Sequence, residues 1–171
     1  ANRFMSGMAL VERAQLYAVA SRSAEKAYAF QAKYHAEKAL SSYEALVADP
    51  QVDIVYVATP HPMHLRHAQM ALKAGKHVLI EKPVCVNTAE LDLLRQTADR
   101  EGRFVMEAMW TRFFPVNLQV VRWLRQGRIG RLRQIQAAFS YGSQMGDGQS
   151  RIYNPLLAGG ALMDVGVYPI S

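Results

Sequence analysis

The sequence contains one cysteine, Cys85, in 171 residues. A single thiol cannot form an internal disulfide, so the chain is not a disulfide-stapled secreted domain, and a reducing, cytoplasmic location is expected. No cysteine or histidine spacing typical of a metal site or of a cysteine protease accompanies it. We therefore interpret Cys85 as a small apolar side chain and predict no metal site.

Long apolar runs and a natural beginning are lacking as well. No run approaches the roughly 20 residues that span a membrane, so no membrane partner is expected. The chain begins at Ala1 instead of a methionine and stops at Ser171 inside patterned sequence. We expect an internal piece of a longer protein, and a missing leader then indicates nothing about targeting.

Negative charge is in short supply, with 14 Asp and Glu against 20 Lys and Arg and a net charge of +6. Arg122, Arg125 and Arg128 share one face of an expected helix, which raises nucleic acid as a partner. Aromatic side chains for base stacking are scarce there, so a solvated face or an oligomer contact is favoured. We predict no nucleic-acid partner, because an anionic cofactor explains the remaining charge.

What the sequence does contain is a regular alternation of apolar runs and helical periods. Half of the residues are hydrophobic, which is enough for a core. Ser23 and Ser42 are good helix N-caps, and Gly75 and Gly102 end two helices. We expect strands over 15–20, 38–39, 52–58, 77–80 and 104–108, and helices over 2–12, 24–34, 43–48, 64–74 and 88–101. This alternation predicts an α/β fold with a doubly wound parallel sheet.

The pattern changes after Trp110. We place the domain boundary near 107–111, which gives a first domain over 1–108 and the start of a second over 109–171. The second part is expected to contain a helix over 115–126, a long strand over 132–140, a Gly- and Ser-rich loop over 141–151, and a last helix after Gly159 and Gly160.

Charged residues follow the most apolar strand. Glu81, Lys82 and Pro83 come directly after 77–80, at the carboxyl end where open α/β sheets bind ligands. A lysine there can hold a positive charge next to a substrate or cofactor. The alternative is a solvated ion pair in a loop.

Asp164 and Tyr168 are four residues apart on the last expected helix, so they could reach a shared ligand. A lysine cation favours the phenolate form of a neighbouring tyrosine. Lys82 and Tyr168 would therefore form an acid–base pair for moving a hydroxyl proton. A packed amphipathic helix with a hydrogen-bonded tyrosine is the alternative.

The strand over 15–20 ends at Ser21 and Arg22, with Lys26 one helical turn further on. An acidic residue at this position binds the ribose hydroxyls of NAD, whereas an arginine accommodates the phosphate of NADP. The two cations favour NADP, with NAD or a solvated loop as alternatives. No G-x-G-x-x-G motif is present, but Ala1 could be the last position of such a turn, directing the next helix at a pyrophosphate.

The turn after 52–58 contains Thr59, Pro60, His61 and His64. Its prolines make the backbone rigid, and either histidine could face a ligand. A capping or surface role is the alternative for each histidine.

Five segments occur in an order that resembles one family: Ala-Val-Ala-Ser-Arg (18–22), Ala-Thr-Pro-His-Pro-Met-His (58–64), Glu-Lys-Pro (81–83), Glu-Ala-Met-Trp-Thr-Arg-Phe (107–113) and Gly-Gly-Ala-Leu-Met-Asp-Val-Gly-Val-Tyr (159–168). Over nearly its whole length the chain is similar to the glucose–fructose oxidoreductase / inositol dehydrogenase / rhizopine catabolism oxidoreductases. It particularly resembles their branch of dimeric dihydrodiol dehydrogenases and NADP-dependent D-xylose dehydrogenases. Most members of the family have histidine at the position of Tyr168, whereas that branch has tyrosine, as this sequence does.

The resemblance implies a Rossmann domain followed by an α/β domain with a mostly antiparallel sheet, both truncated here. It implies that Lys82 is catalytic and precedes a cis proline, that Tyr168 is the acid–base group and that Asp164 supports it. It also places Phe139 at the cofactor or substrate pocket. The expected cofactor contacts are Ser21, Arg22, Lys26, Thr59, Pro60, His61, His64, Glu81, Lys82, Trp110 and Arg112.

The expected function is NADP-dependent oxidation of a secondary alcohol or cyclic hemiacetal in a sugar, polyol or dihydrodiol, and the resemblance implies a homodimer. A non-catalytic NADP-sensing protein of the same fold is the alternative, although a sensor has no need of an acid–base pair. The first strand and glycine turn of such a domain are absent from the sequence, so exposed apolar sheet edges are expected.

Overall fold

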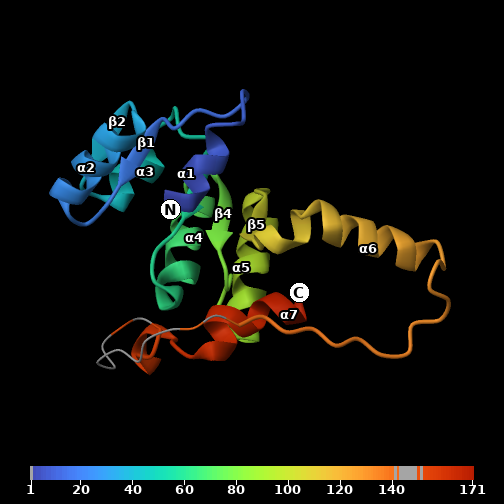
Figure 1. Cartoon of the computed structure of the whole chain (residues 1–171). Coiled ribbons are helices and arrows are strands. Elements are labelled where there is room, and N and C mark those ends of the chain that lie inside the picture. The colour runs from blue at the N-terminus through green and yellow to red at the C-terminus, as the bar shows by residue number, and fades with distance from the viewer. Residues whose placement is uncertain (1, 141, 143–149, 151) are drawn as a thin grey trace.

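Residues 2–140, 142, 150 and 152–171 are described by the computed structural model of the chain (Figure 1). Serine begins two of the first helices, because the Ser23 hydroxyl accepts the Lys26 N–H and the Ser42 hydroxyl accepts the Ala45 N–H. Both predicted N-caps are confirmed. The first elements are α1 (Asn2–Met8), β1 (Ala18–Ala20), α2 (Ala24–Tyr34), β2 (Lys38–Leu40) and α3 (Tyr43–Ala48).

Three parallel strands and two helices follow. A 3-10 turn over His61–Met63 leads from the first of these strands into the next helix, as expected for a turn rich in proline. Glu81 pairs with Ala108 where the strands end, so residues beyond them meet at one edge. The elements are β3 (Ile54–Val57), α4 (His64–Lys73), β4 (His77–Glu81), α5 (Thr88–Glu101) and β5 (Val105–Ala108).

The strands form two parallel sheets, β1–β2 and β3–β4–β5. The predicted α/β class with parallel strands is confirmed, but a single continuous sheet is not formed among the described residues. No described strand joins β1 to β3 by pairing with both, so the two sheets stay separate. Ile54 at the start of β3 is 62% exposed. Exposed apolar surface at a sheet edge agrees with the expectation from the sequence.

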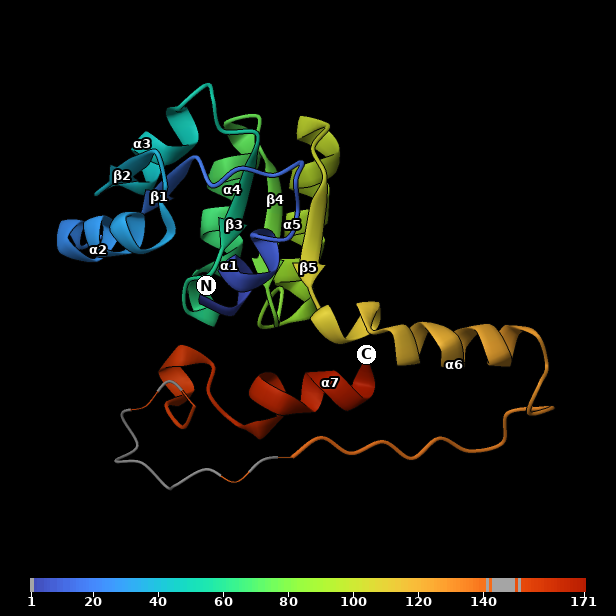
Figure 2. The same cartoon turned by 45° about the horizontal axis from the view of Figure 1, so that its top comes forward.

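The core lies between the three-stranded sheet and the helices α4 and α5 (Figure 2). Val78 and Ile80 of β4 are buried against Leu72 of α4 and Leu94 of α5. Burial of such side chains supplies most of the favourable free energy of folding. Within the described part of the chain, no helix is long and apolar enough to cross a membrane.

The second part of the chain leads away from β5 and returns to it. After a 3-10 turn over Trp110–Phe113, helix α6 (Pro115–Arg125) extends outward, and the chain comes back along 132–140. A π-helix (Leu162–Gly166) and α7 (Val167–Ile170) then lie next to the carboxyl ends of β4 and β5 (Figure 2). This return places the last helix beside the expected ligand edge.

Three element predictions were wrong. Helix α1 ends at Met8 instead of residue 12, because 3-10 turns replace it, with the Leu10 N–H bonded to the Gly7 carbonyl at 3.1 Å. The strand over 15–20 shrinks to Ala18–Ala20, since its pairing with β2 is only three residues long. Residues 132–140 form no strand, because no described segment offers them ladder partners. The antiparallel sheet therefore stays a prediction.

Asp49 connects the two sheets at the amino-terminal side of their strands. Its carboxylate accepts from the Lys38 ammonium at 2.7 Å and from the Gln51 N–H at 3.0 Å, and the Tyr17 hydroxyl lies 3.4 Å from it. Its backbone carbonyl accepts from the buried Lys76 ammonium at 2.8 Å. The hydrogen bonds from Lys38 and from the Gln51 backbone lower the pKa of Asp49.

Asp49→Asn should remove an acid-sensitive part of the stability. A carboxyl group whose folded pKa is lowered stabilises the fold above its unfolded value of about 3.9, and this contribution is lost as the pH falls through the folded value. Below about pH 4, the free energy of unfolding in urea should therefore fall more steeply for the parent than for the variant. Asp92→Asn, at an exposed position of α5, is the control. Equal acid slopes for parent and Asp49→Asn would contradict the expectation.

Candidate functional site

The turn after β4 carries the expected catalytic lysine, and three side chains hold it. The Lys82–Pro83 peptide bond is cis, as predicted. The Glu81 carboxylate accepts the Lys82 N–H at 3.3 Å, and the Glu107 carboxylate from β5 accepts the Val84 N–H at 2.8 Å. The Pro83 carbonyl lies 2.8 Å from the His64 ring. Side chains from two strands and one helix therefore fix the backbone that presents Lys82.

His64 lies at the centre of this arrangement and is completely buried. Its Nδ1 is 2.8 Å from the Pro83 carbonyl oxygen, and its Nε2 is 2.8 Å from the Thr59 carbonyl oxygen. Both ring nitrogens therefore face backbone carbonyls, which gives His64 a structural role, and its contact with a cofactor stays a prediction. His64 ties the turn after β3 to the turn after β4.

Glu81 is held from the neighbouring strand. The Tyr56 hydroxyl of β3 donates to Oε1 of Glu81, and the Phe4 ring of α1 stacks on the Tyr56 ring at 3.9 Å. Burial, followed by the hydrogen bond and charge of Glu81, raises the pKa of Tyr56. Tyr56 is therefore a neutral donor near pH 7. The Glu81 carboxylate is oriented by the Tyr56 hydroxyl and by the Lys82 backbone N–H.

Lys82, Asp164 and Tyr168 come together although 82 residues separate the lysine from the aspartate. The Lys82 ammonium donates to the Asp164 carbonyl and lies 3.2 Å from its Oδ1. Their side chains are only 12% and 8% exposed. The same ammonium is 5.0 Å from the centroid of the Tyr168 ring. The structure thus brings together three of the residues singled out by the sequence.

Aromatic side chains surround Tyr168. The Phe139 ring lies 4.5 Å from the Tyr168 ring, and the Trp110 indole N–H donates to the phenol oxygen at 3.1 Å. Arg112, expected at the same pocket, instead donates to the Ser171 carbonyl at 3.3 Å. His61 is buried nearby, with Nδ1 3.4 Å from the Ala158 carbonyl oxygen. Trp110, which precedes α6, and Phe139 and Tyr168, which follow it, therefore form one aromatic cluster.

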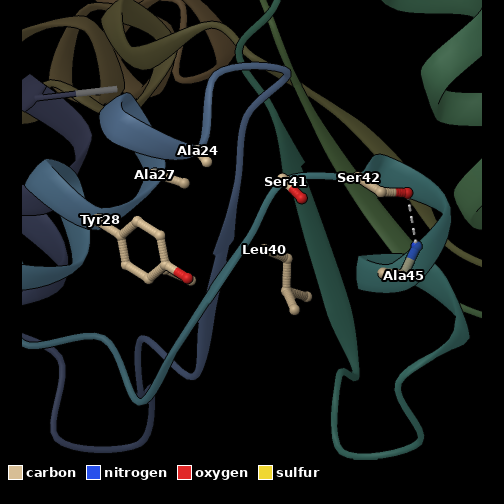
Figure 3. Close-up of a pocket in the computed structure, with 8 residues that line it drawn as sticks. Ala24, Ala27, Tyr28, Leu40, Ser41, Ser42 and Ala45 are labelled. Atoms are coloured by element: carbon tan, nitrogen blue, oxygen red, sulfur yellow. Dashed lines mark hydrogen bonds between the residues drawn. The ribbon is translucent and has the colours of Figure 1, made fainter.

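The expected phosphate end lies after β1. Arg22 and Lys26 are exposed, and neither side chain has a hydrogen bond or ion pair with another residue that the structure describes. The Ser21 hydroxyl accepts the Ser23 N–H at 3.2 Å. A cavity of about 160 Å³ lies at the starts of α2 and α3, lined by Ala24, Ala27, Tyr28, Ala39, Leu40, Ser41, Ser42 and Ala45 (Figure 3), and neither Arg22 nor Lys26 lines it. Two exposed cations close together in the sequence can bind a phosphomonoester by charge-assisted hydrogen bonds.

His67 connects this end with the turn after β3. Its Nδ1 is 3.0 Å from the Thr59 hydroxyl oxygen, and the Tyr43 ring lies 4.8 Å from its own. Burial, followed by the charges of Arg66 and Arg22, lowers the pKa of His67. Thr59 is thereby held in place, and Pro60 next to it is the N-cap residue of the 3-10 turn over His61–Met63.

A parallel α/β fold with cationic turns at the carboxyl ends of its strands is typical of dinucleotide-binding domains. Residues 2–109 match the oxidoreductase family with an NAD-binding Rossmann fold, and residues 117–171 match the GFO/IDH/MocA C-terminal domain. The chain therefore belongs to the glucose–fructose oxidoreductase / inositol dehydrogenase / rhizopine catabolism family, as its motifs indicated.

Several known proteins are similar to the chain. A trans-1,2-dihydrobenzene-1,2-diol dehydrogenase of Danio rerio is 41% identical, with coverage of 94% of this chain and 47% of the relative. A D-xylose 1-dehydrogenase (NADP(+)) of Hypocrea jecorina is 42% identical, with coverage of 93% and 44%. A 3-ketoreductase of Actinomadura kijaniata in complex with NADP and TDP-benzene is 32% identical, with a TM-score of 0.86 and coverage of 97% and 50%. The chain spans about half the length of the curated relatives it matches.

Sequence reasoning missed Tyr56, Glu107 and His67. Tyr56 is part of an apolar strand pattern, which gave no sign of a polar role. Its hydroxyl is important only because it donates to the Glu81 carboxylate at the end of the neighbouring strand β4. Glu107 was noted only as part of a motif, because its partner, the Val84 N–H, is set by the pairing of β4 with β5. The position of Ala1, proposed for the glycine turn, lies outside the described residues, as does most of the loop over 141–151.

Cys85 lies just after the turn that follows β4, and it should be unreactive in the folded protein. Burial, followed by the charges of Glu90 and Glu107, raises the pKa of its thiol to about 11. Because the thiolate is the reacting form, its reaction with Ellman's reagent at about pH 8 should be more than about tenfold slower than in urea-unfolded protein. Cys85→Ser gives the background. Rapid stoichiometric labelling of the folded protein would contradict the assignment of Cys85 as an inert side chain.

Proposed function

We propose that the protein is an NADP-dependent dehydrogenase that oxidises a secondary alcohol or cyclic hemiacetal carbon of a sugar, polyol or trans-dihydrodiol. One observation carries this proposal, namely the buried Lys82 ammonium between Asp164 and the Tyr168 ring at the carboxyl edge of the sheet. The names of the relatives, which act on a dihydrodiol and on D-xylose, support this substrate class. From the family resemblance of its motifs, the complete protein is proposed to be a homodimer.

The residues after β1 fit the phosphate of NADP. Arg22 and Lys26 provide two cations, and neither is neutralised by a carboxylate in the described part of the chain. An acidic residue, which would favour the ribose of NAD, is absent from 21–24. When bound, the cofactor supplies the nicotinamide that takes up the hydride from the substrate carbon.

Tyr168 is proposed to receive the proton of the substrate hydroxyl. In the oxidation, its phenolate oxygen takes this proton while the C–H electron pair leaves as hydride, and the carbon–oxygen bond becomes a carbonyl. Lys82 places a positive charge 5.0 Å from the ring centroid, where it can attract the negatively charged oxygen of this step. Asp164 neutralises and orients Lys82, and a buried ammonium without such a partner is costly.

The substrate class and the catalytic assignment can be tested together. With full-length protein, a panel of D-xylose, other sugars, polyols and a trans-dihydrodiol is followed by absorbance of the reduced nicotinamide. Lys82→Met should abolish turnover of the accepted substrate while the dissociation constant of NADP stays within a few-fold. Lys73→Met, exposed on α4, is the control. Normal turnover by Lys82→Met would refute its role, and NADP binding without turnover on any panel member would favour a sensing protein.

The choice of cofactor depends on Arg22 in this proposal. Arg22→Ala should weaken NADP binding by roughly tenfold or more, because a charge-assisted bond to the phosphate is lost. NAD binding should stay within about twofold, since NAD carries no phosphate at that position. Isothermal titration calorimetry with both dinucleotides measures the ratio, and Arg95→Ala on the exposed side of α5 is the control. A parallel loss of affinity for both dinucleotides would overturn the assignment.

A further inference from the structure

The phenol oxygen of Tyr168 has one direct hydrogen-bond donor among the described residues, and that donor is not Lys82. The Trp110 indole N–H lies 3.1 Å from it. The Lys82 ammonium donates to Asp164 and lies over the face of the Tyr168 ring, 5.0 Å from the centroid. The lysine therefore acts on the phenol through its charge, and the indole acts on it through a hydrogen bond.

An indole N–H can donate but cannot accept a hydrogen bond. Trp110 therefore cannot receive the phenol proton, and this proton stays available for another acceptor. When the phenol has lost its proton, the same N–H donates to a negatively charged oxygen, and such charge-assisted bonds are roughly twice as strong as neutral ones. The contact of Trp110 with Tyr168 is consequently stronger in the phenolate form than in the phenol form.

Both rings are held in position by their own surroundings. Trp110 directly follows the buried Met109 at the end of β5, and its ring packs edge-to-face on Phe114 at 4.8 Å. Tyr168 comes from α7 and packs against Phe139 at 4.5 Å. The two partners are 58 residues apart in the sequence. Their hydrogen bond therefore forms only when α7 lies against the carboxyl end of β5.

The charged groups around Tyr168 leave this role open. Lys82 is paired with Asp164, so the aspartate is directed at the ammonium. Arg112, on the same turn as Trp110, donates to the Ser171 carbonyl at 3.3 Å. His61, the titratable side chain of the turn after β3, is directed at the Ala158 carbonyl. None of these groups is within hydrogen-bond distance of the phenol oxygen in the described part of the chain.

We propose that Trp110 is a catalytic residue of this site, whose indole N–H stabilises the Tyr168 phenolate while that oxygen awaits the substrate proton. This inference rests on the proposed function, in which Tyr168 is the proton acceptor. It divides the work between two groups: Lys82 supplies the positive charge, and Trp110 supplies the fixed hydrogen bond.

The first experiment removes the donor and keeps an aromatic ring. In full-length protein, Trp110→Phe should lower kcat for oxidation by roughly tenfold at pH values below the plateau, because the phenolate has lost a charge-assisted hydrogen bond, with substrate KM within a few-fold. The rate should also require a higher pH to reach its plateau, because the phenolate has lost a donor. Trp123→Phe on α6 removes another tryptophan, is the matched control and should change neither kcat nor the pH profile.

A second measurement does not depend on turnover. In full-length protein labelled with ¹⁵N-indole, the side-chain N–H signal of Trp110 is identified as the one that is missing from Trp110→Tyr. On raising the pH, the Trp110 signal should move as Tyr168 ionises, and Tyr168→Phe should abolish this movement. A Trp110 signal that is insensitive to pH would overturn the proposal even if Trp110→Phe folded poorly.

The outcomes separate this inference from the function on which it rests. If Tyr168→Phe is inactive while Trp110→Phe keeps the parent kcat and pH profile, Trp110 is only a packing residue and the proposed function stands. If Tyr168→Phe retains turnover, Tyr168 is not the proton acceptor, so that part of the proposed function fails and the role of Trp110 fails with it. Loss of turnover in Tyr168→Phe, together with a lowered kcat and a shifted pH profile in Trp110→Phe, supports both.

Discussion

The site depends on the pairing of a buried ammonium with a buried carboxylate, Lys82 with Asp164. Removing two charges from water is costly, so the pair is tolerated only where each group has its partner and further hydrogen bonds. The Asp164 carbonyl supplies such a bond. Since Lys82 stands at the end of β4 and Asp164 on the return of the chain, this contact joins the parallel sheet to the last helices. The position of Tyr168 follows from it.

The backbone around Lys82 is fixed by groups that do no chemistry themselves. The Glu81 and Glu107 carboxylates accept hydrogen bonds from the Lys82 and Val84 backbone N–H groups. The two ring nitrogens of His64 lie against the Pro83 and Thr59 carbonyl oxygens. A lysine side chain has several rotatable bonds, so its ammonium is placed accurately only when its own backbone cannot move. Neighbouring strands supply these supports because the parallel register brings β3, β4 and β5 to one edge.

Much of this arrangement was predictable, and the failures have a common cause. The N-caps at Ser23 and Ser42, the strand over 77–80 and the charged residues after it follow from local pattern and were correctly placed. The strand over 132–140 was wrong, because alternation describes a side-chain pattern and a strand also needs a hydrogen-bonding neighbour. Tyr56 and Glu107 were missed as supports because each acquires its role from a residue on another strand.

The sequence by itself determined the parallel α/β class, the family through its ordered motifs, and the residue types available for acid–base chemistry. Those properties are local, since they depend on periodicity, capping and the order of short segments. The tertiary structure decided which of those residues meet: Lys82 with Asp164, Trp110 with Tyr168, and His64 with two backbone carbonyls. Such contacts link segments up to 82 residues apart. They are set by strand register and by the return of the chain, which no short-range pattern encodes.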